Sequence, residues 1–211
     1  MSQPASSCHD IFRKALMEDV KIRKRELRAE IQEKSEALPD SEYLERCGRI
    51  TERLLDFANF VEAKTVLLFH SMEREPDTMP IIRQCYDMGK VVVLPTTHPK
   101  RQELVTFKVD NPARELIKGA SGRLEPDPRK CKPVPLRFVD LAIVPGLVFD
   151  ERGGRIGSGF GRWDRLIPNL PPTTRKVSLA LEIQIVPQVP MEPHDRYVDI
   201  LITEERVIYK I

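Results

Sequence analysis

The amino-acid sequence predicts an α/β protein: a single three-layer domain with a mostly parallel sheet and N-terminal helices packed on it. The length of 211 residues is typical of one domain, so residues 1–211 are assigned to it. Short runs of apolar and β-branched residues recur along the chain, as expected of strands covered on both faces. Helical patterns separate several of these runs, which favours parallel strands joined by crossovers. Residues 1 to about 20 are expected to form either a frayed or an extra helical N-terminal extension.

Two helices are predicted before the first strand. Across 10–38 apolar residues recur with helical spacing, and Pro39 is expected to end this helix. Asp40 or Ser41 is a suitable N-cap for a second helix, whose apolar residues over 44–57 form one stripe. Both helices are expected to pack on the sheet.

Six later segments are predicted to be strands. Most are continuous apolar runs, but 105–109 alternates apolar and polar residues and is expected at an edge of the sheet. A helix is predicted over 81–88, and Gly89 is expected to end it. The predicted strands cover 65–69, 91–95, 105–109, 139–144, 177–181 and 198–202.

The order of these elements predicts the position of a binding site. Ligands of open parallel sheets bind outside the carboxyl ends of the strands. Loops follow three of the predicted strands after Phe69, Leu94 and Val144. A site is therefore expected where these loops meet.

The composition excludes several classes of protein. Lys and Arg number 34 and Asp and Glu 32, whereas proteins that coat nucleic acids carry a marked cationic excess. The longest apolar stretch, 141–149, contains Pro145 and Gly146 and is much shorter than the roughly 20 residues of a membrane helix. The cysteines form no CxxC pair, and the polar residues 1–10 do not resemble a secretory signal. We therefore expect a cytoplasmic protein with reduced thiols and with neither nucleic-acid nor membrane partners.

A cluster of glycines predicts a phosphate-binding loop. Six of the ten glycines fall within 146–161, and Gly157, Gly159 and Gly161 alternate just before a predicted helix over 162–167. Alternating glycines allow successive backbone N–H groups to converge on one point, and a helix N-terminus adds a partial positive charge. An ordinary tight turn is the alternative that the local sequence leaves open.

Charged residues flank these glycines. Arg155 and Arg162 can supply full positive charges for phosphate oxygens. Asp164 lies one turn into the predicted helix, where a carboxylate would repel phosphate unless a cation lies between them. Mg²⁺ bound by one or two carboxylates and by phosphate oxygens meets this requirement. The alternative is an Asp that only favours a helix N-terminus.

Polar residues outside the glycine segment also suggest a site. Lys24 and Arg28 lie beside the apolar stripe of the first helix, where their charges would either meet an anion or lie in water. Glu75 and its acidic neighbours follow a strand and would either accept N–H groups from a nitrogen-rich ligand or cap the next helix. His194 and Asp195 suggest a catalytic dyad, but adjacent residues on an extended chain point to opposite sides, so Asp195 is interpreted as a second acidic ligand and His194 is left unassigned.

Five motifs, in order over about 24–204, resemble the 5-formyltetrahydrofolate cyclo-ligase family. The family's glycine-rich signature, PGLxFD…G…RxGxGxGYYD, is matched over 145–164. The other four are KxxLR at 24–28, ExxT at 75–78, GxxEP at 122–126 and a VPxxxHDxxVDxxIT-like stretch over 189–203.

The resemblance implies an ATP-dependent ligase of folate one-carbon metabolism, with Mg²⁺ as cofactor. The implied reaction converts 5-formyltetrahydrofolate to 5,10-methenyltetrahydrofolate, ADP and phosphate. The γ-phosphoryl group would go to the formyl oxygen, and N10 of the folate would then attack the activated carbon. The implied partners are these small molecules, and the implied assembly is a monomer or weak homodimer.

The resemblance also implies site residues. Arg162 and Asp164 would be catalytic, and Asp164 and Asp195 would bind the metal. ATP would contact Lys24, Arg25, Glu26, Leu27, Arg28, Arg155, Ile156, Gly157, Ser158, Gly159, Phe160, Gly161, Arg162 and Trp163. The folate would contact Glu75, Ser158, Gly159, Phe160, Gly161 and Arg162.

One departure from the family pattern concerns the reaction itself. The Tyr-Tyr pair before the motif's Asp is replaced by Arg162 and Trp163. Trp retains an aromatic face, but Arg exchanges a hydroxylated ring for a forked cation. A second hypothesis is therefore a catalytically silent member that binds folate or nucleotide as a sensor or partner module.

Overall fold

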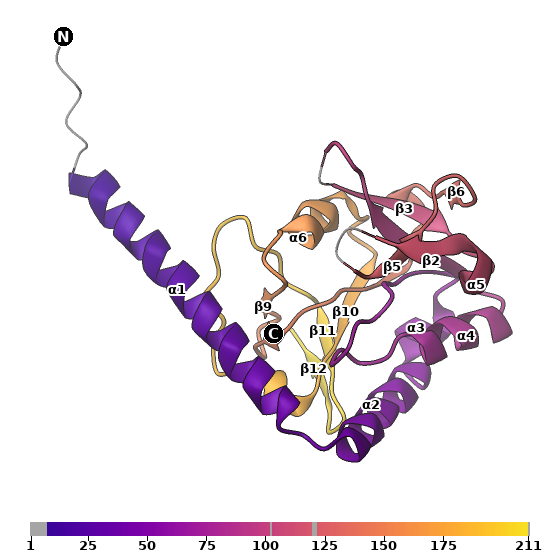
Figure 1. Cartoon of the computed structure of the whole chain (residues 1–211), viewed down its shortest axis with the longest axis horizontal. Helices are drawn as coiled ribbons and strands as arrows, with labels where there is room; N and C mark the ends of the chain where they lie inside the picture. Colours follow the sequence, from indigo (N-terminus) through magenta and orange to yellow (C-terminus); the bar gives the residue numbers. More distant parts are fainter. Residues whose placement is uncertain (1–7, 102, 120–121, 211) are drawn as a thin grey trace, which may run out of the picture.

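The computed structural model describes residues 8–101, 103–119 and 122–210, with the side chains of the first helix from Glu18 onward. It confirms an α/β domain built on one large, mostly parallel sheet (Figure 1). The strand order is β12-β11-β10-β7-β1-β2-β3-β6. These strands are β1 Thr65–Leu67, β2 Val91–Thr97, β3 Leu104–Lys108, β6 Lys132–Pro133, β7 Leu141–Ile143, β10 Arg175–Leu179, β11 Ile200–Ile202 and β12 Val207–Tyr209.

Two short ribbons and several helices complete the described part of the chain. The ribbons pair β4 (Leu116–Lys118) with β5 (Leu124–Pro126), and β8 (Val148–Phe149) with β9 (Arg155–Ile156). The α-helices are α1 Cys8–Glu36, α2 Asp40–Leu55, α3 Ala58–Glu62, α4 Met79–Asp87, α5 Pro112–Glu115 and α6 Arg162–Leu166. Three single 3₁₀ turns are η1 Leu136–Phe138, η2 Ile167–Asn169 and η3 Glu182–Gln184.

The sheet is covered on both faces, which gives the three predicted layers. Successive side chains of a strand point to opposite faces, so Val66 packs in the cluster that contains α2 and α4, while Leu67 packs with α6. Both residues are fully buried. This two-sided burial explains why the central strands are continuous apolar runs.

The first helix packs differently from expectation. Leu27 and Ile31 of α1 are buried against Val148 and Ile156 of the β8–β9 ribbon, and not on the large sheet. The N-terminal half of α1 projects beyond the rest of the domain (Figure 1). Of the proposed extension, residues 8–20 continue α1, and residues 1–7 lie outside the described residues.

Two details of the predicted elements are wrong. Asp40 is the first residue of α2 and not its cap, since Pro39 precedes the helix and no side chain caps it. The Asp40 carboxylate instead accepts a hydrogen bond from Arg74 at 2.7 Å. The β3 strand is not at the edge of the sheet, because the two-residue β6 pairs with its outer side.

The strand order places a crevice at the centre of the sheet. From β1 the chain crosses over to β2 on one side, and β7 then pairs with β1 on the other side. This reversal is a topological switch point, where the loops after neighbouring parallel strands separate and leave room for a ligand. No helix within the described ranges is long and apolar enough to cross a membrane.

Replacing Ile31 with Ala is expected to destabilise the protein by about 2–4 kcal/mol, because it leaves a cavity between α1 and the β8–β9 ribbon. Ile22→Ala, on the same helix at 41% exposure, is the matched control and is expected to cost less than about 1 kcal/mol. Urea denaturation followed by circular dichroism measures both. Equal losses for the two variants would contradict this account of how α1 docks.

Candidate active site

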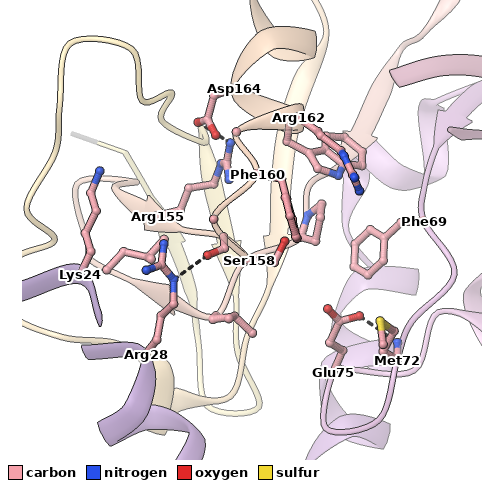
Figure 2. Close-up of a pocket in the computed structure, with 18 of the residues that line it drawn as sticks. Lys24, Arg28, Phe69, Met72, Glu75, Arg155, Ser158, Phe160, Arg162 and Asp164 are labelled. Atoms are coloured by element: carbon pink, nitrogen blue, oxygen red, sulfur yellow. Dashed lines mark hydrogen bonds and ion pairs between the residues drawn. The ribbon is translucent and has the colours of Figure 1, made fainter. Parts of the chain in front are cut away.

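A large cavity lies at the crevice where the loops after β1, β2 and β7 meet. Its volume is about 1360 Å³, and its walls come from α1, the loop after β1, the ends of β2 and β7, the glycine segment and the loop before β11. Figure 2 shows Lys24, Arg28, Arg155 and Asp164 on one side of it, and Phe69, Met72 and Glu75 on the other. Ser158 and Phe160 lie between the two groups.

The buried carboxylate of Asp150 ties two of these walls together. Its Oδ1 accepts the backbone N–H groups of Arg152 at 3.0 Å and Gly154 at 2.8 Å, which closes the turn of the β8–β9 ribbon. Its Oδ2 accepts the N–H of Val189 at 2.8 Å. One side chain thereby joins the ribbon that carries Arg155 to the segment that leads to Asp195.

The glycine segment follows this ribbon and curves along the cavity. Gly159 and Gly161 have φ angles of +99° and +60°, which side chains with a Cβ rarely adopt. The carbonyl of Gly157 accepts a hydrogen bond from Arg28 Nε at 2.9 Å, so α1 holds the start of the loop (Figure 2). Because α6 has only five residues, the loop's own amides and the flanking arginines must supply most of the positive field.

Arg155 is a buried cation at one end of the cavity. Its Nη2 donates to Asp164 Oδ1 at 2.7 Å, and the same oxygen accepts the N–H of Arg196 at 3.0 Å. Burial lowers the pKa of Arg155, and the nearby carboxylates of Asp164 and Asp195 oppose this effect. Its Nε is buried and has no hydrogen-bond partner among the described residues. Such a group favours an additional acceptor supplied by a ligand.

Lys24 is enclosed by two carboxylates. Its Nζ lies 2.7 Å from Glu192 Oε2 and 2.5 Å from Asp195 Oδ2, and the residue is 8% exposed. The charge of Lys24 therefore meets anions at the cavity wall and does not lie in water. Burial lowers the pKa of the neighbouring Arg28, an effect that Asp195 opposes.

The sequence analysis assumed that His194 and Asp195 lie on an extended chain and point to opposite sides, and this assumption is wrong. The Asp195 N–H donates to the Glu192 carbonyl, so Pro193 and His194 form a turn and not an extended segment. His194 Nε2 lies 3.6 Å from Asp195 Oδ1 and 3.9 Å from Glu192 Oε2. Both residues line the cavity.

The opposite end of the cavity is built around Glu75. Its carboxylate forms two hydrogen bonds with Arg123, at 2.7 and 2.8 Å, and accepts the Met72 N–H at 2.8 Å. The rings of Phe69 and Trp163 meet edge to face, with centroids 6.4 Å apart. This end thus combines aromatic walls with a carboxylate held in one orientation.

Two residues of the glycine signature form a stacked pair near the middle of the cavity. The guanidinium of Arg162 lies 4.7 Å from the ring centroid of Phe160, and Phe160 is 61% exposed. Ser158 lines the cavity beside them (Figure 2). The cation that replaces a family tyrosine therefore lies at the wall of the cavity.

Most of the predicted site residues come together in this cavity. Glu26 and Leu27 do not line the cavity, because they lie on different faces of α1 from Lys24 and Arg28. Glu26 pairs with Arg23 on the surface, and Leu27 is buried in the contact with the β8–β9 ribbon. The predicted site residues that line the cavity are Lys24, Arg25, Arg28, Glu75, Arg155, Ile156, Gly157, Ser158, Gly159, Phe160, Gly161, Arg162, Trp163, Asp164 and Asp195.

The sequence analysis missed several charged residues of the lining, and three of them form well-defined contacts. Glu192 shares Lys24 with Asp195, and Arg123 pairs with Glu75. The buried Glu125 accepts hydrogen bonds from the Thr96 hydroxyl at 2.8 Å and the Thr97 N–H at 3.0 Å. Arg123 and Glu125 belong to the GxxEP match, and these two charged residues two positions apart were the available signal.

Residues beside Lys24 could bind a divalent cation. The predicted ligand Asp195 belongs to this group, and the other predicted ligand, Asp164, does not. Within the described ranges, ligand atoms of Glu192, His194 and Asp195 lie within 4.8 Å of one another, and Asp164 is not part of this group. The hydrogen bonds of Asp164 use Oδ1, and Oδ2 takes part in none among the described residues. Carboxylate oxygens are the ligands that Mg²⁺ prefers. Joint binding of a metal by Asp164 and Asp195 stays a prediction.

Comparisons with known proteins identify relatives of this chain. A model of the 5-formyltetrahydrofolate cyclo-ligase family matches residues 20–204. The 5-formyltetrahydrofolate cyclo-ligase of Escherichia coli K12 is 32% identical, over 84% of this chain and 98% of its own length. That of Mus musculus is 28% identical, over 86% of this chain and 94% of its own length.

The fold agrees with these relatives. The solved structure of Aquifex aeolicus 5,10-methenyltetrahydrofolate synthetase has a TM-score of 0.77 and 30% identity, covering 89% of this chain and 92% of that one. This chain therefore shares its fold with the Aquifex aeolicus synthetase. The chain belongs to the 5-formyltetrahydrofolate cyclo-ligase family.

Proposed function

We propose that this chain catalyses the ATP-dependent cyclisation of 5-formyltetrahydrofolate to 5,10-methenyltetrahydrofolate, with release of ADP and phosphate. The observation that carries the proposal is the single cavity of about 1360 Å³, which joins a cationic, glycine-rich end to an aromatic end with a fixed carboxylate. A phosphate donor and a flat, nitrogen-rich acceptor need these two environments side by side. Phosphoryl transfer depends chiefly on such positioning and on charge stabilisation.

ATP is proposed to bind at the cationic end. Arg155 and Arg28 are partly or fully buried there, which strengthens their attraction to phosphate oxygens because the local dielectric constant is low. Amides of the segment 157–161 would contribute further donors. Arg155 is held by Asp164 and Arg28 by the Gly157 carbonyl, so both guanidinium groups are oriented before the nucleotide arrives.

The folate is proposed to bind at the other end, with its pterin ring near Phe69 and Trp163. Glu75 would accept an N–H group of the pterin, since a carboxylate oxygen is a hydrogen-bond acceptor. Ser158 and Phe160 lie between this end and the cationic end, and Arg162, which stacks on Phe160, lies on the side of Phe69 (Figure 2). The formyl oxygen would thus face the γ-phosphoryl group across Arg162, whose charge would stabilise the oxygens of the group in transfer.

Mg²⁺ is the proposed cofactor, held by Asp195 and Asp164 at the cationic end. When bound, it would neutralise charge on the phosphate oxygens. The chain's own contribution is to keep acids and cations interleaved: Lys24 lies between Glu192 and Asp195, and Arg155 lies against Asp164. This arrangement lets anionic phosphates approach carboxylates that would otherwise repel them.

The wider setting follows from the same proposal. The partners are the small molecules ATP and 5-formyltetrahydrofolate, the location is the cytoplasm, and the assembly is a monomer or weak homodimer. The comparisons give no support to a catalytically silent sensor or partner module, since the relatives described above carry the name of the enzyme.

The direct test is a cyclisation assay. Purified protein given ATP, Mg²⁺ and 5-formyltetrahydrofolate is expected to produce the near-ultraviolet absorbance of methenyltetrahydrofolate, together with one ADP for each product molecule. Omission of ATP should abolish the signal. Folate binding by calorimetry without any absorbance change would favour the silent module.

The variant Asp164→Asn is expected to lower turnover by about a hundredfold or more with the fold intact, because charge in the transition state loses its carboxylate and metal support. Asp110→Asn is the matched control, since Asp110 pairs with Lys108 on the surface. Steady-state kinetics and thermal melting measure both variants. Wild-type turnover in Asp164→Asn would remove this residue from the mechanism.

Arg162→Tyr tests the departure from the family pattern. If the guanidinium stabilises the phosphoryl group in transfer, this change is expected to lower kcat by about tenfold or more, with a smaller effect on the KM for folate. The aromatic replacement keeps a surface that can stack on Phe160. An increase in kcat would mean that the natural arginine hinders formyl-folate chemistry.

A further inference from the structure

Arg123 is a partly buried charge of the cavity, and it stands at a variable position of the GxxEP match. It precedes β5 and reaches across the cavity wall to the loop after β1. Its guanidinium donates from both Nη atoms to the two oxygens of Glu75, at 2.7 and 2.8 Å. The side chains of Arg123 and Glu75 are 19% and 14% exposed, so water screens this ion pair only weakly.

The same guanidinium makes two more contacts with the loop after β1. It lies 5.0 Å from the ring centroid of Phe69, and Nη1 also donates to the His70 carbonyl. Phe69 in turn meets the edge of Trp163. Because a guanidinium is planar and its donors form a rigid fork, these contacts fix the carboxylate and the ring relative to each other.

The ion pair leaves Glu75 able to accept one more hydrogen bond. A carboxylate has about four acceptor positions. The described residues use three of them, through the two Arg123 donors and the Met72 N–H. Since Arg123 already balances the charge, the remaining position suits a neutral N–H donor, whereas a second cation would gain little.

We propose that Arg123 is a positioning residue for the folate substrate. It holds the Glu75 carboxylate and the Phe69 ring in the orientation that accepts the pterin, and it thereby sets the affinity for folate. It makes no contact with Lys24, Arg28 or Arg155 among the described residues, so the affinity for ATP is independent of it. This inference rests on the proposed placement of the pterin at Glu75.

The test uses two variants of Arg123 and a matched control. Arg123→Met removes the charge and keeps an unbranched apolar chain, while Arg123→Lys keeps the charge and loses the fork. The control Arg137→Met removes another arginine that stacks on a phenylalanine, with its guanidinium 4.6 Å from the Phe138 ring, outside the cavity. The KM for 5-formyltetrahydrofolate, the KM for ATP, kcat and thermal melting are measured for each.

Arg123→Met is expected to raise the KM for folate by about tenfold or more. The substitution removes a bidentate charged contact and leaves the partly buried Glu75 carboxylate without its cationic partner. Arg123→Lys should raise it less, and the KM for ATP should stay within about twofold in both. The control should match the wild type. An unchanged or lower folate KM in folded Arg123→Met, or an equal rise in both KM values, would overturn the proposal.

A double-mutant cycle with Glu75→Gln separates this inference from the proposed folate placement. Because Arg123 acts through Glu75, the double variant should bind folate no more weakly than Glu75→Gln alone, whereas independent contributions would add. Binding without ATP can be followed by the fluorescence of Trp163, the single tryptophan of the chain. If Glu75→Gln leaves folate affinity unchanged, the placement itself fails. If Glu75→Gln weakens binding and both Arg123 variants do not, only the role of Arg123 fails.

Discussion

The central constraint on this structure is that charges lining a deep cavity must be balanced within its walls. Arg155 against Asp164, Lys24 between Glu192 and Asp195, and Arg123 against Glu75 each meet this condition. Burial makes an uncompensated charge costly, and each of these three cations has a carboxylate beside it. The partners come from distant parts of the chain, and the site therefore depends on the complete fold.

The loops that carry these charges are fixed by a few backbone-directed contacts. Asp150 accepts N–H groups from its own ribbon and from Val189, which joins the glycine segment to the acidic segment before β11. Arg28 then ties α1 to the start of the glycine loop. These contacts use one carboxylate and one guanidinium to restrain three segments, and this restraint orients donors before a ligand binds.

The two ends of the cavity have different physical characters, which suits a reaction between unlike substrates. The cationic end is rich in backbone amides and guanidinium groups, and the other end combines Phe69 and Trp163 with a neutralised carboxylate. Phe160 lies between them, and Arg162, a cation in place of the family's tyrosine, stacks on its ring (Figure 2). The chemistry is thus divided between two binding environments that share one space, and the stacked pair lies where they meet.

The sequence by itself determined the central strands, the mostly parallel sheet and most of the glycine loop. These features depend on local patterns: consecutive apolar residues in 65–69 and 139–144, and glycines at alternate positions. The short β12 and the two ribbons were missed because two or three residues carry no periodicity. Only the tertiary structure decided that Lys24 meets Glu192, that Arg123 orients Glu75, and that a turn brings His194 to the side of Asp195. Such pairings depend on which residues the crossovers bring together, and spacing along the chain does not encode them.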